Sequence, residues 1–353
     1  MWLTSLAAAG PGRLGPGEDP ARARVRRGTY ARRVTSGAMR ILLLGGTGFI
    51  GGAVVTEALA RGHEPVLFTR GRTGSELFPG VSRLTGDRDT GDLTALRAGE
   101  WDAVVDLSGY YPAQVAHAME VLGDRVGRYL FVSSHAVYDR ANGPGATEDA
   151  PRREPLREAD VLDDDTYGRL KVACEDDVLA RYGDRATIVR PIKVVGPGDV
   201  RDAATYWVRR AARGGRVAVP GSPEQPVQFV DSRDLASLIV TLVEDGRAGA
   251  FHAVGPPEPV TLGGVIEACA RLAGTTVEPV AVPLGEVPRF FPLTRAPELW
   301  DTLRRDGSKA WAAGMPKTPL AETLRDVKAW DDARGRPELP NGLTEGREAE
   351  LLA

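Results

Sequence analysis

The chain has 353 residues, of which 42% are hydrophobic and 26% charged, with 45 basic and 48 acidic side chains. This ordinary apolar content excludes a chain that is disordered throughout, and no apolar run approaches the ~20 residues that a membrane span needs. Two cysteines, Cys174 and Cys269, are too few for a disulfide framework or a tetrahedral metal site, which favours the reducing cytoplasm, and a net charge of −3 gives no general reason to expect nucleic acid as a partner.

Residues 1–38 differ from the rest of the chain in charge and pattern. They hold seven arginines against Glu18 and Asp19, a net charge of +5, whereas the remainder holds 38 basic and 46 acidic residues, a net charge of −8. The segment has no periodic apolar face, so we predict a disordered, Arg-rich arm. A dispensable extension before a start at Met39 is the simplest interpretation, and an organellar presequence and a nucleic-acid-binding arm are the alternatives.

From Met39 the sequence MRILLLGGTGFIGGAVVTEALARGHEPVLFTRG indicates a strand, a glycine turn, a helix and a second strand. Glycines at 45, 48 and 51 let the backbone approach a pyrophosphate, and the helix N-terminus attracts it with free N–H groups. The sequence therefore predicts a dinucleotide site. The residues that we assign to it here are Gly45, Thr47, Gly48, Phe49, Ile50 and Gly51.

Further apolar runs alternate with helical patterns, with strands expected near Leu84 and at 101–109, 128–134 and 186–191, and helices at 112–123 and 166–182. Such a pattern indicates an α/β fold, a doubly wound, Rossmann-type parallel sheet covered on both faces. We predict an NAD(P)-binding domain at 39–190 and a smaller substrate-binding region at 191–335. A strand and helix pattern at 226–246 could return to the main sheet, so the two are interleaved, and 336–353 is expected to be a tail.

The end of the second strand bears on the choice between NAD and NADP. An NAD-selective site usually carries an acid there, which accepts from the ribose 2'-hydroxyl. This strand ends in Arg70, followed by Arg72, and guanidinium groups suit a 2'-phosphate. We predict NADP as the cofactor, with NAD and merely solvated arginines as the alternatives. Asp87 is placed to accept from the adenine amino group, and Ser108 is also assigned to the cofactor site.

Tyr167 and Lys171 stand four residues apart at the start of a predicted helix, so both lie on one face. A free phenol has a pKa of ~10, and an adjacent ammonium stabilises the phenolate. Lowering this pKa by about three units requires roughly 4 kcal/mol from the lysine and a positive nicotinamide ring. Ser133 and Ser134 end a predicted strand, at the sheet edge where such folds place ligands. We predict that Tyr167 and Lys171 are catalytic, and that the hydroxyl of one of the two serines holds the reacting oxygen against the tyrosine.

The chain resembles the extended short-chain dehydrogenase/reductases, the NAD-dependent epimerase/dehydratase family. The likeness runs from Met39 to about Gly335 and includes GGTGFIG, SSHAVY at 133–138, YGRLK, RPIKVVGPGD at 190–199 and FVDSRDLA at 229–236. It implies that Tyr167 is the acid/base, Lys171 its partner and a ribose ligand, and Ser134 the hydroxyl that orients the substrate. The GDRD and LFTRG segments also look like a branch that contains a chloroplast stem-loop RNA-binding protein.

The chain departs from the family pattern at three positions. His135 and Ala136 stand where the dehydratases have Asp and Glu, so water elimination by that route is not expected. Lys193 stands where sugar-nucleotide enzymes have an Asn that contacts the diphosphate, which weakens a nucleotide-sugar substrate, although a lysine could still bind an anion. Arg70 favours NADP(H), which is typical of reductases. For His135, a structural role is favoured over donation to a substrate oxygen.

We therefore expect an NAD(P)-dependent oxidoreductase that transfers hydride at a secondary alcohol or ketone carbon of a small molecule, as an NADPH-dependent reductase or as an epimerase. The alternative is a non-catalytic NADP(H)-sensing or RNA-binding protein on the same fold. The spacing of the histidines matches no metal-binding motif, so no catalytic metal is expected. Neither nucleic acid nor a membrane is an expected partner, and a homodimer is an open alternative.

The substrate site is expected around the catalytic residues. We assign Ser133, Ser134, Tyr110 and Lys193 to it. Substrate choice is expected to involve Tyr110 and Tyr111, the segment after Tyr138, and the surroundings of Tyr206, Trp207 and Gln228.

Overall fold

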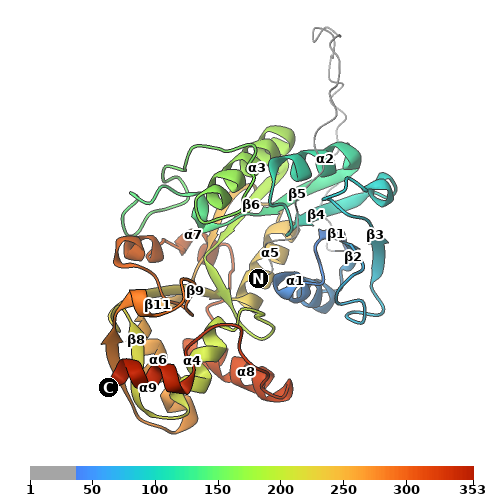
Figure 1. Ribbon diagram of the computed structural model, residues 1–353. Helices are drawn as coiled ribbons and strands as arrows, with labels where there is room; N and C mark the ends of the chain where they lie inside the picture. Colours follow the sequence, from blue (N-terminus) through green and yellow to red (C-terminus); the bar gives the residue numbers. More distant parts are fainter. Residues whose placement is uncertain (1–36) are drawn as a thin grey trace.

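Seven parallel strands form the centre of the larger part of the molecule (Figure 1). The computed structural model describes residues 37–353, so nearly all of the predicted arm at 1–38 lies outside the described residues. The strand order is β10-β6-β5-β4-β1-β2-β3. The strands are β1 (Arg40–Leu44), β2 (Glu64–Thr69), β3 (Ser82–Thr85), β4 (Trp101–Asp106), β5 (Val126–Val132), β6 (Ala186–Pro191) and β10 (Gly249–Ala253).

Helices cover both faces of this sheet, which confirms the predicted fold class. On one face lie α1 (Phe49–Ala60) and α5 (Ser232–Glu244), and on the other α2 (Pro112–Leu122) and α3 (Thr166–Tyr182). Side chains of β1 alternate between the two cores. Ile41 and Leu43 pack toward α1 and α5, and Leu42 and Leu44 toward α2 and α3, and none is more than 1% exposed. Each such burial stabilises the fold by about 1.5–3 kcal/mol, which explains the unbroken apolar run.

The direction of the strand order reverses between β1 and β4, and such a reversal opens a crevice at the carboxyl ends of parallel strands. The chain leaves β1 through the glycine turn, and it leaves β4 through residues 107–109. These two segments adjoin, since the Leu107 amide donates to the Leu44 carbonyl at 3.1 Å. The fold therefore brings together the turn after β1 and the segment after β4, both of which hold residues assigned to the cofactor.

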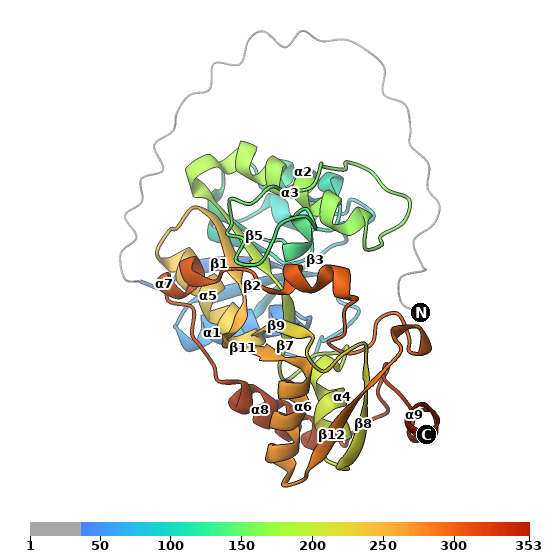
Figure 2. The same ribbon diagram turned by 90° about the vertical axis from the view of Figure 1, so that its left-hand side faces the viewer.

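The smaller part of the molecule contains two short sheets and four helices (Figure 2). The sheets comprise β7 (Lys193–Val195), β9 (Pro226–Asp231) and β11 (Gly255–Thr261), and β8 (Gly215–Pro220) with β12 (Val277–Val282). The helices are α4 (Ala203–Ala211), α6 (Leu262–Ala273), α8 (Leu320–Ala333) and α9 (Glu345–Leu352). A short helix, α7 (Ser308–Ala312), contacts β10, and 3₁₀ turns lie at η1 (Thr94–Arg97), η2 (His135–Val137), η3 (Gly183–Arg185), η4 (Leu284–Glu286) and η5 (Pro297–Leu303).

The chain passes back and forth between the two parts. Strand β9 belongs to the smaller part, α5 then packs on α1, and β10 joins the main sheet beside β6. None of the helices in the described part of the chain combines the length and apolar character that a membrane crossing requires.

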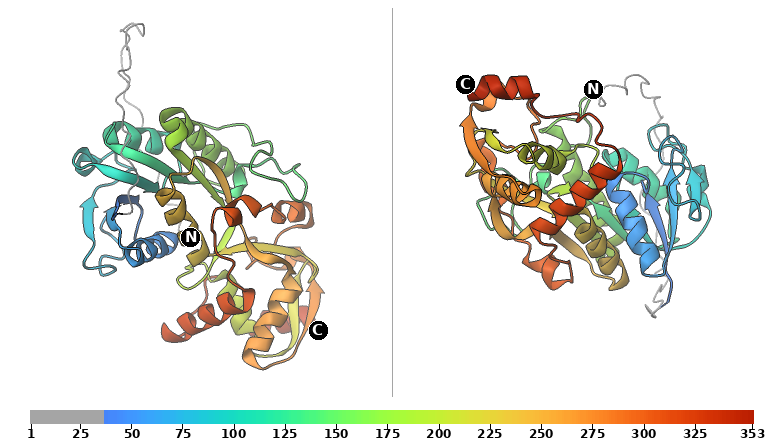
Figure 3. Two further views of the ribbon diagram at one scale, coloured as in Figure 1. Left: turned by 180° about the vertical axis from the view of Figure 1, so that it is seen from behind. Right: turned by 90° about the horizontal axis from the view of Figure 1, so that it is seen from below.

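The segment 336–353, expected to be a tail, is instead a packed part of the fold. Helix α9 lies on the smaller part in each view (Figures 1 and 3). Its Glu348 is 4% exposed and accepts from Arg210 Nε at 2.5 Å and from Arg213 Nη2 at 2.6 Å. The backbone amide of Ala218 in β8 also donates to it, at 3.2 Å. A short helix in which half of the residues are charged gives little hydrophobic signal, which is why the sequence did not predict this contact.

Replacing Glu348 with alanine is expected to lower the free energy of unfolding by about 3–5 kcal/mol, because the Arg210 guanidinium stays buried without its partner. Urea denaturation followed by circular dichroism measures this loss. Glu350→Ala on the same helix is the matched control, since its side chain is 67% exposed and its pairing contributes at most about 1 kcal/mol. Equal stability of the two variants would contradict the packing of α9.

Candidate functional site

The glycine turn after β1 depends on two glycines and leaves open space at a third. Gly45 has a φ of +104°, and a Cβ on Gly51 would lie 2.2 Å from the Gly45 carbonyl oxygen, so neither position accepts a side chain. Gly48 caps α1, and a Cβ there would meet nothing within 4 Å. The first turn of α1 has no acidic residue and no side-chain cap. Its N–H groups and the open space fit the pyrophosphate of a dinucleotide.

The other residues assigned to the turn surround this space in different ways. Phe49 and Ile50 are half-buried and pack against the core beneath the sheet, so they anchor the start of α1. Thr47 is half-buried, and a Cβ on Gly74 would approach its Cβ to 3.0 Å. Across the crevice, the Ser108 hydroxyl donates to the Leu44 carbonyl at 3.1 Å. The residues predicted from two separate segments therefore do lie around one crevice.

Arg70 and Arg72 follow β2 and are more than half exposed, with side-chain exposures of 54% and 68%. Arg70 pairs with Asp89 at 3.4 Å, and Arg72 pairs with Asp87 at 3.2 Å. Asp87 also accepts from the Asp89 amide at 3.0 Å. Exposed pairs of this kind contribute little free energy, so both guanidinium groups can turn toward a phosphate. Asp87 has a partner here that the sequence did not predict.

Lys171 lies beneath the crevice and is 2% exposed. Its ammonium donates to the Gly109 carbonyl at 2.7 Å and to the Val132 carbonyl at 2.9 Å, at the ends of β4 and β5. Burial lowers the pKa of Lys171 to about 8, so the side chain is mostly charged at neutral pH. The distance from Nζ to the centre of the Tyr167 ring is 6.0 Å. Lys171 thus places a fixed positive charge near the tyrosine.

Tyr167 projects from the first turn of α3 toward Ser134. Burial raises the pKa of Tyr167 above its ordinary value, while a hydrogen bond with Ser134 and the charge of Arg201 act in the opposite direction. Its ring lies 6.5 Å from that of Tyr110, between ring centres. The lowered phenol pKa expected from the Tyr–Lys spacing is therefore not a property of these side chains by themselves, because desolvation outweighs the charges around them.

Ser133, Ser134 and His135 follow β5 at the same edge of the sheet. Ser134 accepts from the Ala136 amide at 3.2 Å, which caps the turn η2 and fixes the direction of its hydroxyl. Ser133 Oγ and His135 Nδ1 are both buried, and neither has a hydrogen-bonding partner in the described part of the chain. Burial, together with the charges of nearby arginines, lowers the pKa of His135 to about 3, so its ring is neutral at physiological pH.

A buried ion pair supports this edge of the sheet, and sequence reasoning missed it. Arg88 donates to both carboxylate oxygens of Asp106, at 2.6 and 3.0 Å, and Tyr129 donates to the same carboxylate at 2.7 Å. Although burial acts against ionisation, Arg88 holds the pKa of Asp106 below its usual range. The pair anchors the segment that carries Gly109. The sequence offered two signals of this pair, Asp106 at the end of β4 and Arg88 in GDRD. That the two residues meet depends on the tertiary fold.

Lys193 lies apart from the catalytic residues, in an open cavity of about 630 Å³ in the smaller part. Arg201, Arg295 and Gln228 also line this cavity. Gln228, near which substrate-choosing residues were expected, is one of the lining residues, whereas the two arginines were not predicted.

Three aromatic residues expected near the substrate have other roles. Trp207 is completely buried and packs edge-on against Tyr206, with ring centres 4.9 Å apart, so both belong to the core of the smaller part. Helix α4 is buried along nearly its whole length, which encloses both side chains in protein, and the expectation that substrate choice involves their surroundings stays a prediction. Tyr111 caps the start of α2.

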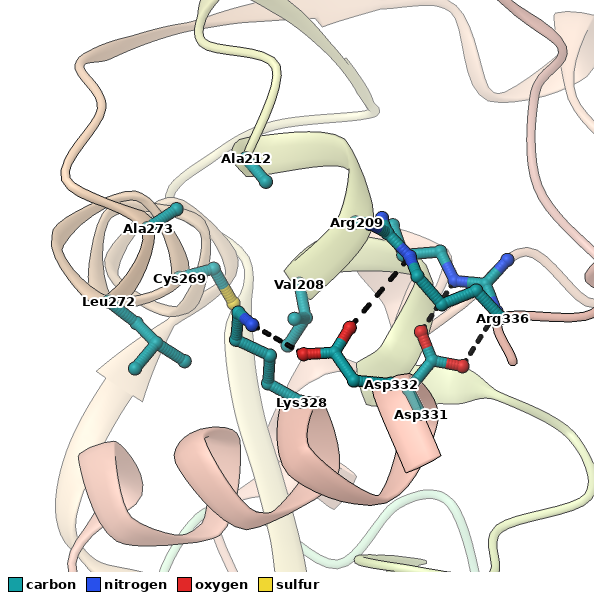
Figure 4. A pocket seen from close by; sticks show the side chains of 10 residues that line it. All are labelled: Val208, Arg209, Ala212, Cys269, Leu272, Ala273, Lys328, Asp331, Asp332 and Arg336. Carbon is teal, nitrogen blue, oxygen red and sulfur yellow. Dashed lines mark hydrogen bonds and ion pairs between the residues drawn. The ribbon is translucent and has the colours of Figure 1, made fainter. Parts of the chain in front are cut away.

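A second hollow, of about 330 Å³, lies between α4, α6 and α8 (Figure 4). Its charged groups are paired with one another. Arg209 donates to both oxygens of Asp331 at 2.6 Å, and Lys328 donates to Asp332 at 2.6 Å. Because these charges satisfy one another, the hollow offers a ligand no unpaired charge from the described residues.

Metal-binding side chains do not gather anywhere in residues 37–353, where no group of three or more His, Cys, Asp or Glu could hold an ion. Both cysteines, Cys174 and Cys269, are buried and free.

Comparison with known proteins relates the chain to oxidoreductases and epimerases. It is 27% identical over 255 residues to the chloroplast stem-loop binding protein of 41 kDa b from Arabidopsis thaliana, covering 68% of this chain and 64% of that protein. It is 28% identical over 255 residues to 2'-dehydrokanamycin reductase from Streptomyces kanamyceticus, covering 69% and 70%. The chain thus spans just under two thirds of the length of the chloroplast relative.

Solved structures share the fold. The enzyme WbmG from Bordetella bronchiseptica, in complex with NAD, superimposes with a TM-score of 0.65 at 20% identity, over 87% of this chain and 98% of that one. UDP-glucose 4-epimerase from Thermotoga maritima gives 0.63 at 20% identity, over 84% and 100%. A family model described as the NAD dependent epimerase/dehydratase family matches residues 41–255, more than half of the chain. The chain therefore belongs to this family of NAD(P)-dependent, extended short-chain dehydrogenase/reductase enzymes.

Proposed function

We propose that this protein is an NADP(H)-dependent oxidoreductase that transfers hydride at a secondary alcohol or ketone carbon. The observation that carries the proposal is the gathering of Ser134, Tyr167 and Lys171 at one edge of a parallel sheet, beside the glycine turn. The name of the reductase relative from Streptomyces kanamyceticus agrees with carbonyl reduction. Reduction of a ketone and epimerisation through a transient ketone use the same three side chains, so the proposal includes both.

The dinucleotide, when bound, donates or accepts the hydride at its nicotinamide ring. The protein supplies the proton and the orientation. In the reductive direction the Ser134 hydroxyl donates a hydrogen bond to the substrate carbonyl oxygen, and the Tyr167 hydroxyl gives that oxygen its proton. The phenolate left behind needs positive charge, which the buried ammonium of Lys171 provides at a fixed position. In the oxidative direction the same proton returns to Tyr167.

Lys171 can hold its charge in the interior because two carbonyl groups accept from it. A buried ammonium without acceptors would lose its proton far more readily. The third N–H of Lys171 donates no hydrogen bond within residues 37–353 and suits a ribose hydroxyl. We infer that Lys171 both orients the cofactor and favours the ionised tyrosine.

NADP(H) is proposed over NAD(H) because two guanidinium groups, and no strand-terminal acid, follow β2. The aspartates that pair with them, Asp87 and Asp89, hold them at the mouth of the crevice until a 2'-phosphate competes. A phosphate dianion attracts a guanidinium more strongly than a single exposed carboxylate does.

The chloroplast relative's name raises a non-catalytic, RNA-binding role as a second candidate. The complete set of Ser134, Tyr167 and Lys171 favours the enzyme, since neither RNA binding nor nucleotide sensing needs a buried lysine beside a tyrosine. The described residues also hold more acidic than basic side chains, so they lack the excess of positive charge with which proteins bind RNA.

The glycine turn provides a test of cofactor binding. Gly48→Ala should keep the wild-type melting temperature, because a Cβ there meets no protein atom, and should weaken NADPH binding about tenfold or more by filling the space for the pyrophosphate. Gly51→Ala should lower the melting temperature as well, because its Cβ strikes the Gly45 carbonyl. NADPH fluorescence titration and thermal melting measure both effects. Undiminished NADPH affinity in Gly48→Ala would count against this site.

The cofactor preference is tested with Arg72→Gln. The variant should bind NADPH about tenfold more weakly, because a charge-assisted hydrogen bond to the 2'-phosphate is lost, and should bind NADH as the wild type does. NADH is the internal control, since it lacks that phosphate. A wild-type protein that prefers NADH tenfold would refute the NADP assignment.

Tyr167→Phe should lower the turnover of NADPH with an accepted ketone by about 10²–10⁴-fold, because the proton donor is lost. Its affinity for NADPH should change less than twofold. Tyr182→Phe on the same helix is the matched control, since Tyr182 lies at the opposite end of α3 from Tyr167. Ketones and secondary alcohols are screened by NADPH consumption or formation. Retained turnover in Tyr167→Phe would overturn the proposed role.

A further inference from the structure

A buried series of hydrogen bonds lies behind the turn that carries Ser134. It runs from Glu175 in α3 through Arg190 in β6 and Tyr138, which ends η2, to His252 in β10. None of these four side chains belongs to a residue that is more than 3% exposed. We call Glu175, Arg190, Tyr138 and His252 the buried network.

Arg190 is the branch point of the buried network. Its Nε and Nη2 donate to the two carboxylate oxygens of Glu175, at 2.9 and 2.7 Å. Its Nη1 donates to the Tyr138 hydroxyl and also, at 2.8 Å, to the Glu148 carbonyl. A bidentate pair fixes the plane of a guanidinium group, so the N–H that reaches Tyr138 has a fixed direction. One residue of the sheet thus holds both α3 and the end of η2.

The hydrogen-bonding partners of His252 determine which of its ring nitrogens carries the proton. Nδ1 lies 2.8 Å from the Asp306 carbonyl oxygen, which can only accept, so Nδ1 is the protonated nitrogen. Nε2 of the neutral ring is then an acceptor, and the Tyr138 hydroxyl donates to it at 2.5 Å. The other acceptor near this hydroxyl, the Glu148 carbonyl, is at 3.2 Å and already accepts from Arg190.

This arrangement requires a neutral His252 ring. Burial, together with the charges of Arg190 and Arg305, lowers the pKa of His252, although the Glu148 carboxylate acts in the opposite direction. The ring is therefore neutral at physiological pH. Arg305 also lies over the Tyr138 ring, with its guanidinium carbon 4.8 Å from the ring centre, so the phenol is held both at its hydroxyl and on its face.

The turn η2 joins the buried network to Ser134. Ser134 caps the start of this single turn and Tyr138 caps its end. The Val137 amide donates to the Ser134 carbonyl, and the Tyr138 amide donates to the His135 carbonyl, both at 3.3 Å. Because the turn is this short, a change in the position of Tyr138 also moves the Ser134 hydroxyl.

Helix α3 approaches the same turn so closely that only glycine fits between them. A Cβ on Gly168 would lie 2.0 Å from the Ala136 carbonyl oxygen. Gly168 adjoins Tyr167, so this contact brings Tyr167 within reach of Ser134. Glu175 lies further along α3, where it anchors the buried network. The buried network therefore links the helix that carries Tyr167 to the turn that carries Ser134.

We propose that His252 is a positioning residue, which accepts the proton of the Tyr138 hydroxyl, holds η2 against α3 and thereby aligns Ser134 with Tyr167. The inference rests on the proposed function for the chemistry that Ser134 and Tyr167 perform. His252 acts only through Tyr138.

The hydrogen-bonding arrangement is tested by nuclear magnetic resonance of protein labelled with ¹⁵N-histidine, at neutral pH and without substrate. The chain has four histidines, and His252→Gln identifies the signals of His252. We expect a proton on Nδ1 and none on Nε2, and we expect the Nε2 signal to shift in Tyr138→Phe, which removes the donor. A proton on Nε2, or an Nε2 signal that does not shift in Tyr138→Phe, would overturn the proposal.

The effect on the reaction is tested by the turnover of NADPH with an accepted ketone. Tyr138→Phe should lower kcat about 10–10²-fold, because Ser134 is no longer aligned, and should leave KM and NADPH affinity within twofold of the wild type. It removes one oxygen atom, and Arg190 Nη1 keeps the Glu148 carbonyl as acceptor, so the variant should fold.

Two variants of His252 separate positioning from packing. His252→Leu fills the space without an acceptor and should lower kcat as Tyr138→Phe does, whereas His252→Gln offers an amide oxygen to the Tyr138 hydroxyl and should retain more of the wild-type kcat. His63→Gln is the matched control, since His63 is also buried but pairs with Glu244 in α5, and it should turn over as the wild type does. Equal losses in His252→Leu and His252→Gln would overturn the proposal.

The two proposals fail separately. A wild-type protein that turns over no ketone or secondary alcohol would remove the proposed function. A wild type that turns over, together with an unimpaired Tyr138→Phe, would overturn only the role of His252.

Discussion

The buried ammonium of Lys171 is the interaction on which this site depends. A charge in the interior persists only where acceptors replace water, and here the carbonyls of Gly109 and Val132 do so. Both carbonyls lie at the ends of parallel strands, so their positions follow from the sheet. The Arg88–Asp106 pair anchors the segment that carries Gly109, and thus fixes one of the two acceptors. The sheet and the Arg88–Asp106 pair therefore hold Lys171 in place beneath the crevice.

Two kinds of buried charge divide the molecule. Pairs such as Arg210 with Glu348 are complete, and they fasten one element of the fold to another. The guanidinium of Arg305 is different, since its Nε and Nη1 are buried without an acceptor among residues 37–353. Unpartnered buried polar groups cost free energy. Ser133 and His135 after β5 also hold such an atom, as do Trp101 and Arg125 elsewhere in the described fold, so these atoms by themselves do not mark a ligand site.

Much of the fold follows from local sequence pattern. The helix expected at 166–182 is α3 (Thr166–Tyr182), and the helix expected at 112–123 is α2 (Pro112–Leu122), because periodic apolar residues and their flanking glycines are local signals. The position of Ser134 at the ligand-binding edge of the sheet followed from the rule that strand ends share one edge, whereas its meeting with Tyr167 depends on how α3 packs. The meeting of Lys193 and Arg295 in one cavity could not be predicted this way, since the two come from segments more than a hundred residues apart. The burial of Trp207 likewise depends on contacts with distant segments, which leave no periodic pattern.

The central claim is that bound cofactor reverses the effect of burial on Tyr167. Without cofactor, desolvation holds the pKa of this phenol above its ordinary value. The positive nicotinamide of NADP⁺ and the ammonium of Lys171 together should bring it down toward neutrality. Ultraviolet titration of the wild type, with the spectrum of Tyr167→Phe subtracted, isolates this one tyrosine. A downward shift of its pKa on saturation with NADP⁺ is the predicted result, and an unchanged pKa would contradict the account.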